Sequence, residues 1–132
     1  IRKSNPNDMP QVLELIKELA VFEKEPDAVI ITEEDLVKDG FGKDPLFTCF
    51  VAEIEDKIVG MALVYYRFST WKGRAIHLED LIVKENLRGS GIGKALYTRV
   101  IQYAAEKQVK RIEWAVLNWN VGAIKFYERS GA

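Results

Sequence analysis

The amino-acid sequence predicts a single α/β domain (α+β, with a mixed β-sheet) that has helices on both sides of the sheet. Residues 46–54 and 57–68 are β-rich runs joined by a short polar turn, which is the signal of an antiparallel hairpin. Residues 75–117 then give a strand, a glycine-rich turn, a helix and a further strand, and such a crossover joins parallel strands. At 132 residues the chain has the length of one domain. Antiparallel and parallel strands together define the mixed sheet.

Two helices are expected before the strands. In "NDMPQVLELIKELAVFEKE" the apolar residues recur at helical spacing, and Asn7 or Asp8 is the candidate N-cap. The side chains that share this stripe are Met9, Val12, Leu13, Ile16, Leu19 and Ala20. In the second, shorter helix, Thr32 and Asp35 have the spacing of a capping box. Gly40 is the expected stop of that helix.

The strands and later helices follow in the order that a mixed sheet needs. The turn at 55–57 joins "LFTCFVAEI" to "KIVGMALVYYRF", and the loop "STWKGR" leads to a third strand, "AIHLEDLIV". The glycine loop opens a helix whose expected inner face is Leu96, Val100, Ile101 and Ala104. "RIEWAVL" predicts a further strand and "VGAIKFYERSG" a last helix, ended by Gly131. We expect the strands at 76–84 and 111–117 to splay apart.

Composition excludes several classes of function. The formal net charge of −1 gives no reason to expect nucleic-acid binding. Cys49 is the only cysteine and His77 the only histidine, which excludes an intrachain disulfide framework and argues against a metal site. No run is long and apolar enough to cross a bilayer, and no signal peptide is visible, so we expect no membrane association and a cytoplasmic location. We expect residues 1–132 to form one domain that is incomplete at both ends.

The stretch "LRGSGIGKAL" combines a positive charge, bare backbone and a helix start, which together predict an anion site. The glycines are spaced G-x-G-x-G, so the G-x-G-x-x-G dinucleotide fingerprint does not fit. A P-loop does not fit either, because Arg88 replaces its first glycine and Ala95 its Ser or Thr. A glycine-rich turn without a ligand is the alternative for the loop taken alone.

Together with its neighbours the loop resembles a known family. Residues 88–93 match the R/Q-x-x-G-x-G pyrophosphate loop of the GNAT superfamily of N-acetyltransferases. "LIKELAVFEKE", "DGFG", "YYRFSTWKGR", "LEDLIV" and "AVLNWN" resemble the diamine (spermidine/spermine) acetyltransferases, most of all the branch that acetylates the ε-amine of thialysine. The resemblance spans essentially the whole chain. It implies the GNAT acyl-CoA N-acyltransferase fold, here without the family's last strands, which help to shape the substrate site and the dimer.

The resemblance also implies acetyl-CoA as co-substrate and assigns residues to it. The loop would hold the pyrophosphate through the main-chain N–H groups of residues 89–94, with charge from its two basic residues; the loop residues are Arg88, Gly89, Ser90, Gly91, Ile92, Gly93 and Lys94. The strand Leu81, Ile82 and Val83 would offer its edge to the pantetheine arm. Asn120 would donate or accept a side-chain hydrogen bond to the same molecule. No metal is implied.

Two positions match the family's catalytic residues. Glu79 matches the substrate-binding carboxylate and general base, which acts through water, and Tyr127 matches the general acid that protonates the leaving thiolate. The alternative for Tyr127 is a core residue whose hydroxyl reaches the surface. His77 and Glu79 share a strand face, which is more often a structural pair than a catalytic one. Cys49 is expected to be a core residue.

The expected amine substrate is a small cation. Phe22 and Glu23 match an aromatic–acidic pair that contacts the amine in the diamine enzymes, and Trp71 falls where those enzymes line their substrate channel. With Glu79 and Asp80, Glu23 would form an acidic cleft. Ser69 stands where the polyamine enzymes carry an aspartate, which favours an amine smaller than the long polyamines.

Three functions are therefore compared. The first is acetylation of a small primary amine by a homodimeric enzyme, with the dimer implied by resemblance alone. The second is a non-catalytic sensor module that binds coenzyme A and has lost the chemistry. The third is acetylation of a protein N-terminus or a peptide lysine. The presence of both Glu79 and Tyr127 favours an enzyme.

Overall fold

The computed structural model describes residues 1–114, and the predicted last helix, Tyr127 and Asn120 lie outside them. The sheet has the strand order β1-β2-β3-β4-β5. The strands are β1 (Arg2–Lys3), β2 (Thr48–Ile54), β3 (Lys57–Ser69), β4 (Gly73–Val83) and β5 (Ile112–Trp114). The helices are η1 (Pro6–Asp8), α1 (Met9–Phe22), α2 (Glu33–Phe41), η2 (Glu85–Leu87) and α3 (Ile92–Glu106). Strands β1 to β4 pair antiparallel and β4 pairs parallel with β5, which confirms the mixed sheet.

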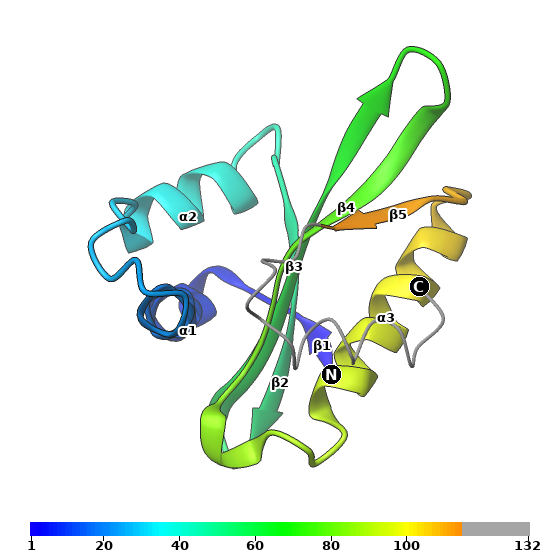
Figure 1. The fold of residues 1–132 in the computed structure, drawn as a ribbon. Coiled ribbons are helices and arrows are strands. Elements are labelled where there is room, and N and C mark those ends of the chain that lie inside the picture. The colour runs from blue at the N-terminus through cyan, green and yellow to red at the C-terminus, as the bar shows by residue number, and fades with distance from the viewer. Residues whose placement is uncertain (115–132) are drawn as a thin grey trace.

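The sheet separates two hydrophobic cores (Figure 1). Helices α1 and α2 cover one face, where Met9 and Leu15 of α1 pack with Val51 and Met61 of the sheet. Helix α3 covers the other face, where Leu96 packs in a cluster of strand residues. Because neighbouring residues of a strand point to opposite faces, the same strands supply both cores. The structure thus confirms helices on both sides of the sheet.

Helix α2 begins as predicted but ends later. Asp35 N–H donates to Thr32 Oγ1 (3.2 Å) and Thr32 N–H donates to the Asp35 carboxylate (2.9 Å), which is the predicted capping box. The expected stop at Gly40 is wrong, because the helix continues to Phe41 and Gly42 is its C-cap. Gly40 has a packing role instead, since a β-carbon there would lie 2.3 Å from the Phe47 ring.

The inner face of α3 also differs from the prediction at one position. Leu96, Val100 and Ala104 are buried, whereas Ile101 is 44% exposed. Its place is taken by Tyr97 and Tyr103, which are both buried. Each helical residue turns the chain by about 100°, so Ile101 lies one step past the buried stripe and faces outward.

The β2–β3 hairpin turns on two residues. Glu55 and Asp56 have φ values of 49° and 65°, and two consecutive residues with positive φ match the right-handed twist of the flanking strands. The predicted turn also included Lys57, which is the first residue of β3.

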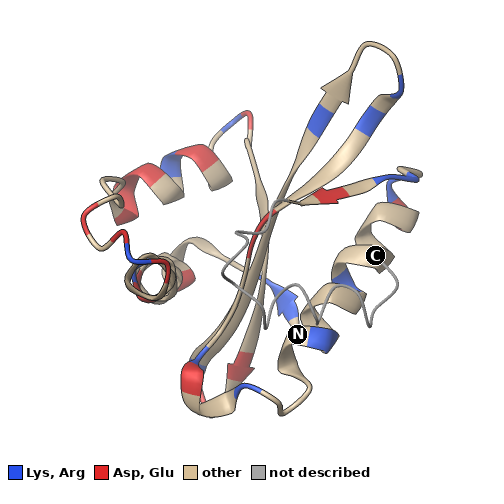
Figure 2. Cartoon of the chain, in the orientation of Figure 1, with Lys and Arg blue, Asp and Glu red and all other residues tan. Residues whose placement is uncertain are grey.

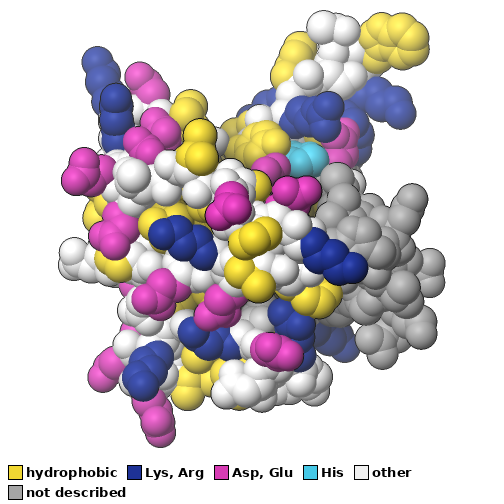
Figure 3. Space-filling model, turned by 60° about the vertical axis from the view of Figure 1, so that its left-hand side comes forward, with side chains coloured by type: hydrophobic (Ala, Val, Ile, Leu, Met, Phe, Trp, Pro, Cys, Tyr) yellow, Lys and Arg dark blue, Asp and Glu magenta, His cyan; other side chains and the backbone are white. Residues whose placement is uncertain are grey.

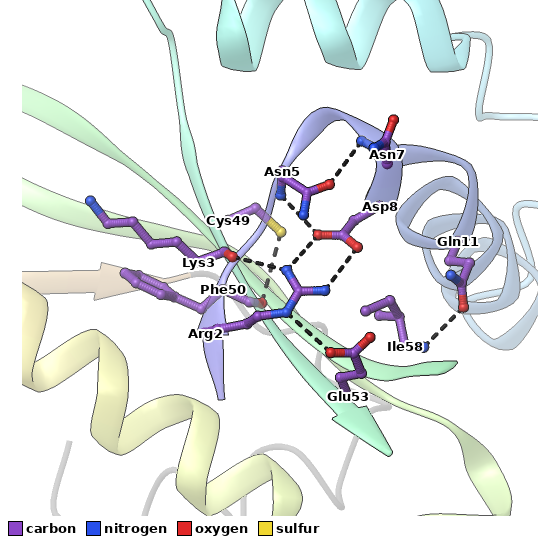
Figure 4. A network of polar contacts seen from close by, with 10 residues as sticks. All are labelled: Arg2, Lys3, Asn5, Asn7, Asp8, Gln11, Cys49, Phe50, Glu53 and Ile58. Carbon is purple, nitrogen blue, oxygen red and sulfur yellow. Dashed lines mark hydrogen bonds and ion pairs between the residues drawn. The ribbon is translucent and has the colours of Figure 1, made fainter. Parts of the chain in front are cut away.

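A polar network closes the N-terminal edge of the sheet, where β1 was not predicted from the sequence (Figure 4). The Arg2 guanidinium donates to both carboxylate oxygens of Asp8, at 2.7 and 3.0 Å, and to Glu53 at 3.2 Å. The Asp8 carboxylate also accepts from the Asn5 N–H at 2.8 Å. The hydrogen bonds from Arg2 hold the pKa of Asp8 below its usual value. Asp8 precedes α1 as predicted, but its side chain ties β1 to the helix instead of capping it.

Strand β5 pairs parallel with β4 over the three residues of β5 that the structure describes. Ile76, His77 and Leu78 pair with residues 112–114. The remainder of the predicted strand at 111–117 lies outside the described residues, so the splay between these two strands stays a prediction.

Candidate active site

A β-bulge in β4 brings two acidic residues to one face of the sheet. Val64 pairs with Leu78 and Leu63 pairs with Asp80, so Glu79 has no residue opposite it on β3. In a regular strand, neighbouring side chains point to opposite faces. The extra residue shifts this alternation, so that Glu79 and Asp80 both lie on the side covered by α1 and α2.

Glu79 is held by two aromatic side chains on that face. Tyr65 Oη donates to Glu79 Oε1 at 3.2 Å, and His77 Nε2 lies 3.6 Å from the same oxygen. Tyr65 and His77 are cross-strand partners whose ring centres are 5.0 Å apart. His77 is 9% exposed, whereas half of the Glu79 side chain is exposed. The expected proximity of His77 and Glu79 is thus present, and Tyr65 is a contact that the sequence analysis missed.

Asp80 and Glu23 complete an acidic cluster with Glu79. Burial, followed by the charges of Glu79 and Glu23, raises the pKa of Asp80 to about 6. Burial also raises the pKa of Glu23, which is the C-cap of α1. Figure 3 shows acidic side chains beside the histidine on this face. The charges of Glu79 and Glu23 disfavour a charge on Asp80, and a positive ligand would relieve this repulsion, so the cluster is suited to bind a cation.

The glycine loop leads from the end of η2 to the start of α3. Gly89 and Gly91 have φ values of 85° and 91°, which glycine adopts without strain, and a β-carbon on either would meet nothing within 4 Å. Gly91 is the N-cap of α3 and makes no side-chain cap. The first helical hydrogen bond runs from Ala95 N–H to Gly91 O (3.0 Å). The N–H groups of residues 92–94 precede that bond, so they are available to an anion.

The loop's side chains add charge and shape. The Arg88 guanidinium lies 5.2 Å from the centre of the Phe22 ring, and its Nε donates to Val83 O at 3.4 Å. Ser90 Oγ donates to Leu87 O, which holds the turn. Lys94 is exposed and borders a shallow groove of about 470 Å³ along α3, which Arg99 also lines. Figure 2 shows basic residues along α3 and acidic residues around α2.

The end of β4, between the acidic cluster and the glycine loop, has one unpaired edge among the described residues. Leu81, Ile82 and Val83 pair with β3 on one side, and within residues 1–114 no strand pairs with their other side. Ile82 is buried, whereas Leu81 and Val83 are half-buried against the α3 side. This segment runs from the acidic cluster to η2 and the glycine loop.

Trp71 lies apart from the acidic cluster within this chain. It sits at the tip of the β3–β4 hairpin, which projects from the body of the molecule, and is 93% exposed (Figure 1). Six residues of β4 separate the tip from Glu79, which is about 20 Å along an extended strand. Ser69 Oγ accepts from the N–H groups of Trp71 and Lys72, at 3.2 and 3.1 Å, and so stabilises the turn.

Comparison with known proteins decides the family. Residues 9–132 match the acetyltransferase (GNAT) family. The chain belongs to the GNAT acetyltransferase family. This GNAT chain is 43% identical over 140 residues to the thialysine N-epsilon-acetyltransferase of Bos taurus, which covers all of the chain and 82% of that relative. It is 38% identical over 139 residues to the spermidine/spermine N(1)-acetyltransferase-like protein 1 of Homo sapiens, covering all of the chain and 20% of that protein.

Solved structures share the GNAT fold. An aminoglycoside acetyltransferase from an uncultured soil metagenomic sample, in complex with trehalose, superposes with a TM-score of 0.83 at 26% identity, over 99% of this chain and 86% of that one. The chain is therefore an N-acetyltransferase of the GNAT fold, as its sequence predicts. GNAT acetyltransferases use acetyl-CoA as co-substrate. Among the described residues, no helix is long and apolar enough to cross a membrane, and no cluster could hold a metal ion.

Proposed function

We propose that the protein transfers the acetyl group of acetyl-CoA to a primary amine of a small cationic substrate, by direct attack in a ternary complex. The observation that carries this proposal is the bulge at Glu79, which turns two adjacent carboxylates toward Glu23 on the strand that leads to the glycine loop. A cation site and an anion site are thereby connected by one short segment. Diamines, polyamines and thialysine-like amines are the substrate class, supported by the names of the relatives.

The coenzyme's binding residues follow from the loop. The residues present fit a pyrophosphate, because Gly89 and Gly91 leave open space in front of an uncapped helix start. Of the main-chain N–H groups of residues 89–94, that of Ser90 already donates to Leu87 O at 3.3 Å, and the others bind the pyrophosphate, with charge from Arg88 and Lys94. The open edge at residues 81–83 pairs with the pantetheine amides. Asn120 hydrogen-bonds to the same molecule. Acetyl-CoA supplies an acetyl group activated as a thioester.

The chain's own side chains bind the amine and move its proton. An alkylammonium has a pKa near 10.4 and no lone pair, so it must lose a proton before it attacks. Glu79 takes that proton through water, and Tyr127 donates one to the departing thiolate. Glu23 and Asp80 bind the remaining positive charge, and Phe22 packs against its alkyl chain. Trp71, at the hairpin tip, lines the approach of the substrate.

A thiol-release assay with acetyl-CoA and a panel of diamines, thialysine, lysine and aminoglycosides tests the function, with peptides as a second panel. We expect turnover with small diamines or thialysine. Tyr127→Phe should lower kcat by about 10²-fold with coenzyme affinity little changed, because general-acid catalysis contributes roughly 10²–10⁴-fold. Tight coenzyme A binding without turnover of any amine would establish the sensor function instead. Turnover of peptides alone would establish the third function.

We also propose that the protein acts as a homodimer, on the strength of the family resemblance. Sedimentation of the full-length protein is expected to give twice the mass of one chain. A monomer at micromolar concentration would contradict this part of the proposal.

A further inference from the structure

Tyr65 and His77 form an aromatic pair behind Glu79 that none of the site assignments uses. They face each other across β3 and β4, with ring centres 5.0 Å apart and a tilt of 39°. Both polar groups of the pair approach the same oxygen, Glu79 Oε1. Within residues 1–114 the second oxygen of Glu79 accepts no hydrogen bond, and half of the side chain is exposed.

We propose that Tyr65 is the positioning residue for Glu79: its ring packs against the His77 ring, and its hydroxyl holds one carboxylate oxygen so that the other is presented to the substrate. A bulged residue has no cross-strand neighbour to set the direction of its side chain. The hydrogen bond from Tyr65 provides that direction. This inference rests on the proposed function, because it concerns the base of the same reaction.

The contact also gives the two neighbouring carboxylates, Glu79 and Asp80, different surroundings. A hydroxyl that donates to a carboxylate favours its ionised form. Asp80 receives no such bond among the described residues, and its pKa is raised to about 6. Two neighbouring acids with different surroundings divide the roles of proton holder and base. Tyr65 therefore gives Glu79 a hydrogen-bond donor that Asp80 lacks among the described residues, which makes Glu79 the candidate base of the two.

The charged and titratable groups around Glu79 and its two aromatic partners come from four elements. Tyr65 of β3 and His77 and Asp80 of β4 act on Glu79 or beside it, and Glu23 at the end of α1 acts on Asp80. Arg67 of β3 acts on Tyr65, and Glu113 of β5 pairs with His77 across the sheet and with Arg67 in an ion pair. Burial, and then the charge of Glu79, raises the pKa of Tyr65. Removing the charge of Glu79 should therefore lower the pKa of Tyr65, which gives a readout that needs no enzyme activity.

The first measurement is an NMR titration of the tyrosine ring carbons in the wild type and in Glu79→Gln. We expect the Tyr65 signal to titrate at lower pH in Glu79→Gln, while the Tyr66 signal stays unchanged. Tyr66 is the matched control, because it is adjacent in sequence, lies on the opposite face of β3 and interacts with Tyr103 and Arg74 instead. An unchanged Tyr65 signal would overturn the contact.

The second measurement compares Tyr65→Phe and Tyr66→Phe in the thiol-release assay. Tyr65→Phe should lower kcat/KM about tenfold and move the acid limb of its pH profile upward, because the carboxylate of the base loses its hydrogen-bond donor. Tyr66→Phe should change neither. Equal behaviour of the two variants would overturn the positioning role. If the wild type acetylates no amine, the proposed function fails, and the NMR titration alone decides whether Tyr65 holds Glu79.

Discussion

At the scale of single residues, the charge of Asp80 is costly. Asp80 is largely removed from water and feels the charges of Glu79 and Glu23, so its charged form is disfavoured. Such a group lowers stability when it is ionised, and it is retained where its charge serves binding. We therefore expect the cluster to lower the stability of the fold and to raise its affinity for a cation.

Asp80→Asn should stabilise the fold at neutral pH and weaken amine binding. The pKa of Asp80 is about 6 in the folded chain and near 3.8 when unfolded, so its contribution to stability falls as the pH rises from about 4 to 6. We expect the variant to gain about 2 kcal/mol in the free energy of unfolding at pH 7.5 and almost nothing at pH 4. Urea unfolding at both pH values measures this. A gain that is equal at both would point to packing instead of charge.

At the scale of elements, the start of α3 combines two features that leave its first N–H groups open. Its N-cap is a glycine with positive φ, and its first N–H groups have no side-chain cap. A capping side chain at Gly91 would stabilise the helix but would occupy the space in front of those N–H groups. The uncapped start is therefore consistent with an anion site.

Gly91→Ala tests this element, with Gly73→Ala as the control. Both glycines have positive φ, 91° and 80°, and both face open space, so alanine costs similar backbone strain at either position. Only the Gly91 β-carbon would enter the space where we propose that the pyrophosphate binds. We expect coenzyme A to bind about tenfold more weakly to Gly91→Ala, roughly 1.4 kcal/mol, and normally to Gly73→Ala. Calorimetry with coenzyme A checks this, and equal affinities would remove the loop from the coenzyme site.

At the scale of the whole molecule, the two faces of one sheet pack against two separate hydrophobic cores. Cys49 points to the α1 and α2 side and its neighbour Phe50 to the α3 side, and both are buried. Neither core can lose its sheet residues without disturbing the other. The described part of the chain is therefore expected to unfold as one cooperative unit.

The thiol of Cys49 reports on that cooperativity. Burial raises its pKa to about 12, so the folded protein should not react with a thiol reagent at pH 8. We expect labelling to begin only in the urea range where helical ellipticity is lost. Labelling at clearly lower urea would show that the α1 and α2 side opens independently. The same inertness of Cys49 means that a thiol-release assay detects only the thiol of the coenzyme.

The sequence by itself determined the order of the helices and strands from α1 to β5 and the capping box at Thr32, and it predicts an anion site at the glycine loop. These signals are local, because a cap needs residues three positions apart and a bare loop needs only its own glycines. The loop and its neighbours also sufficed to recognise the family, which the match over residues 9–132 confirms. Glu79, Asp80 and Glu23 could be named as candidates for the same reason.

Only the tertiary structure decided how those acids are arranged. The bulge at Glu79 is a property of the β3–β4 register, and the hydrogen bond from Tyr65 joins residues 14 positions apart. Pairing of β1 with β2 depends on residues far apart in the chain, and the close approach of the Phe47 ring leaves no room for a side chain at Gly40. Such contacts form between segments that fold onto each other, so no local pattern encodes them.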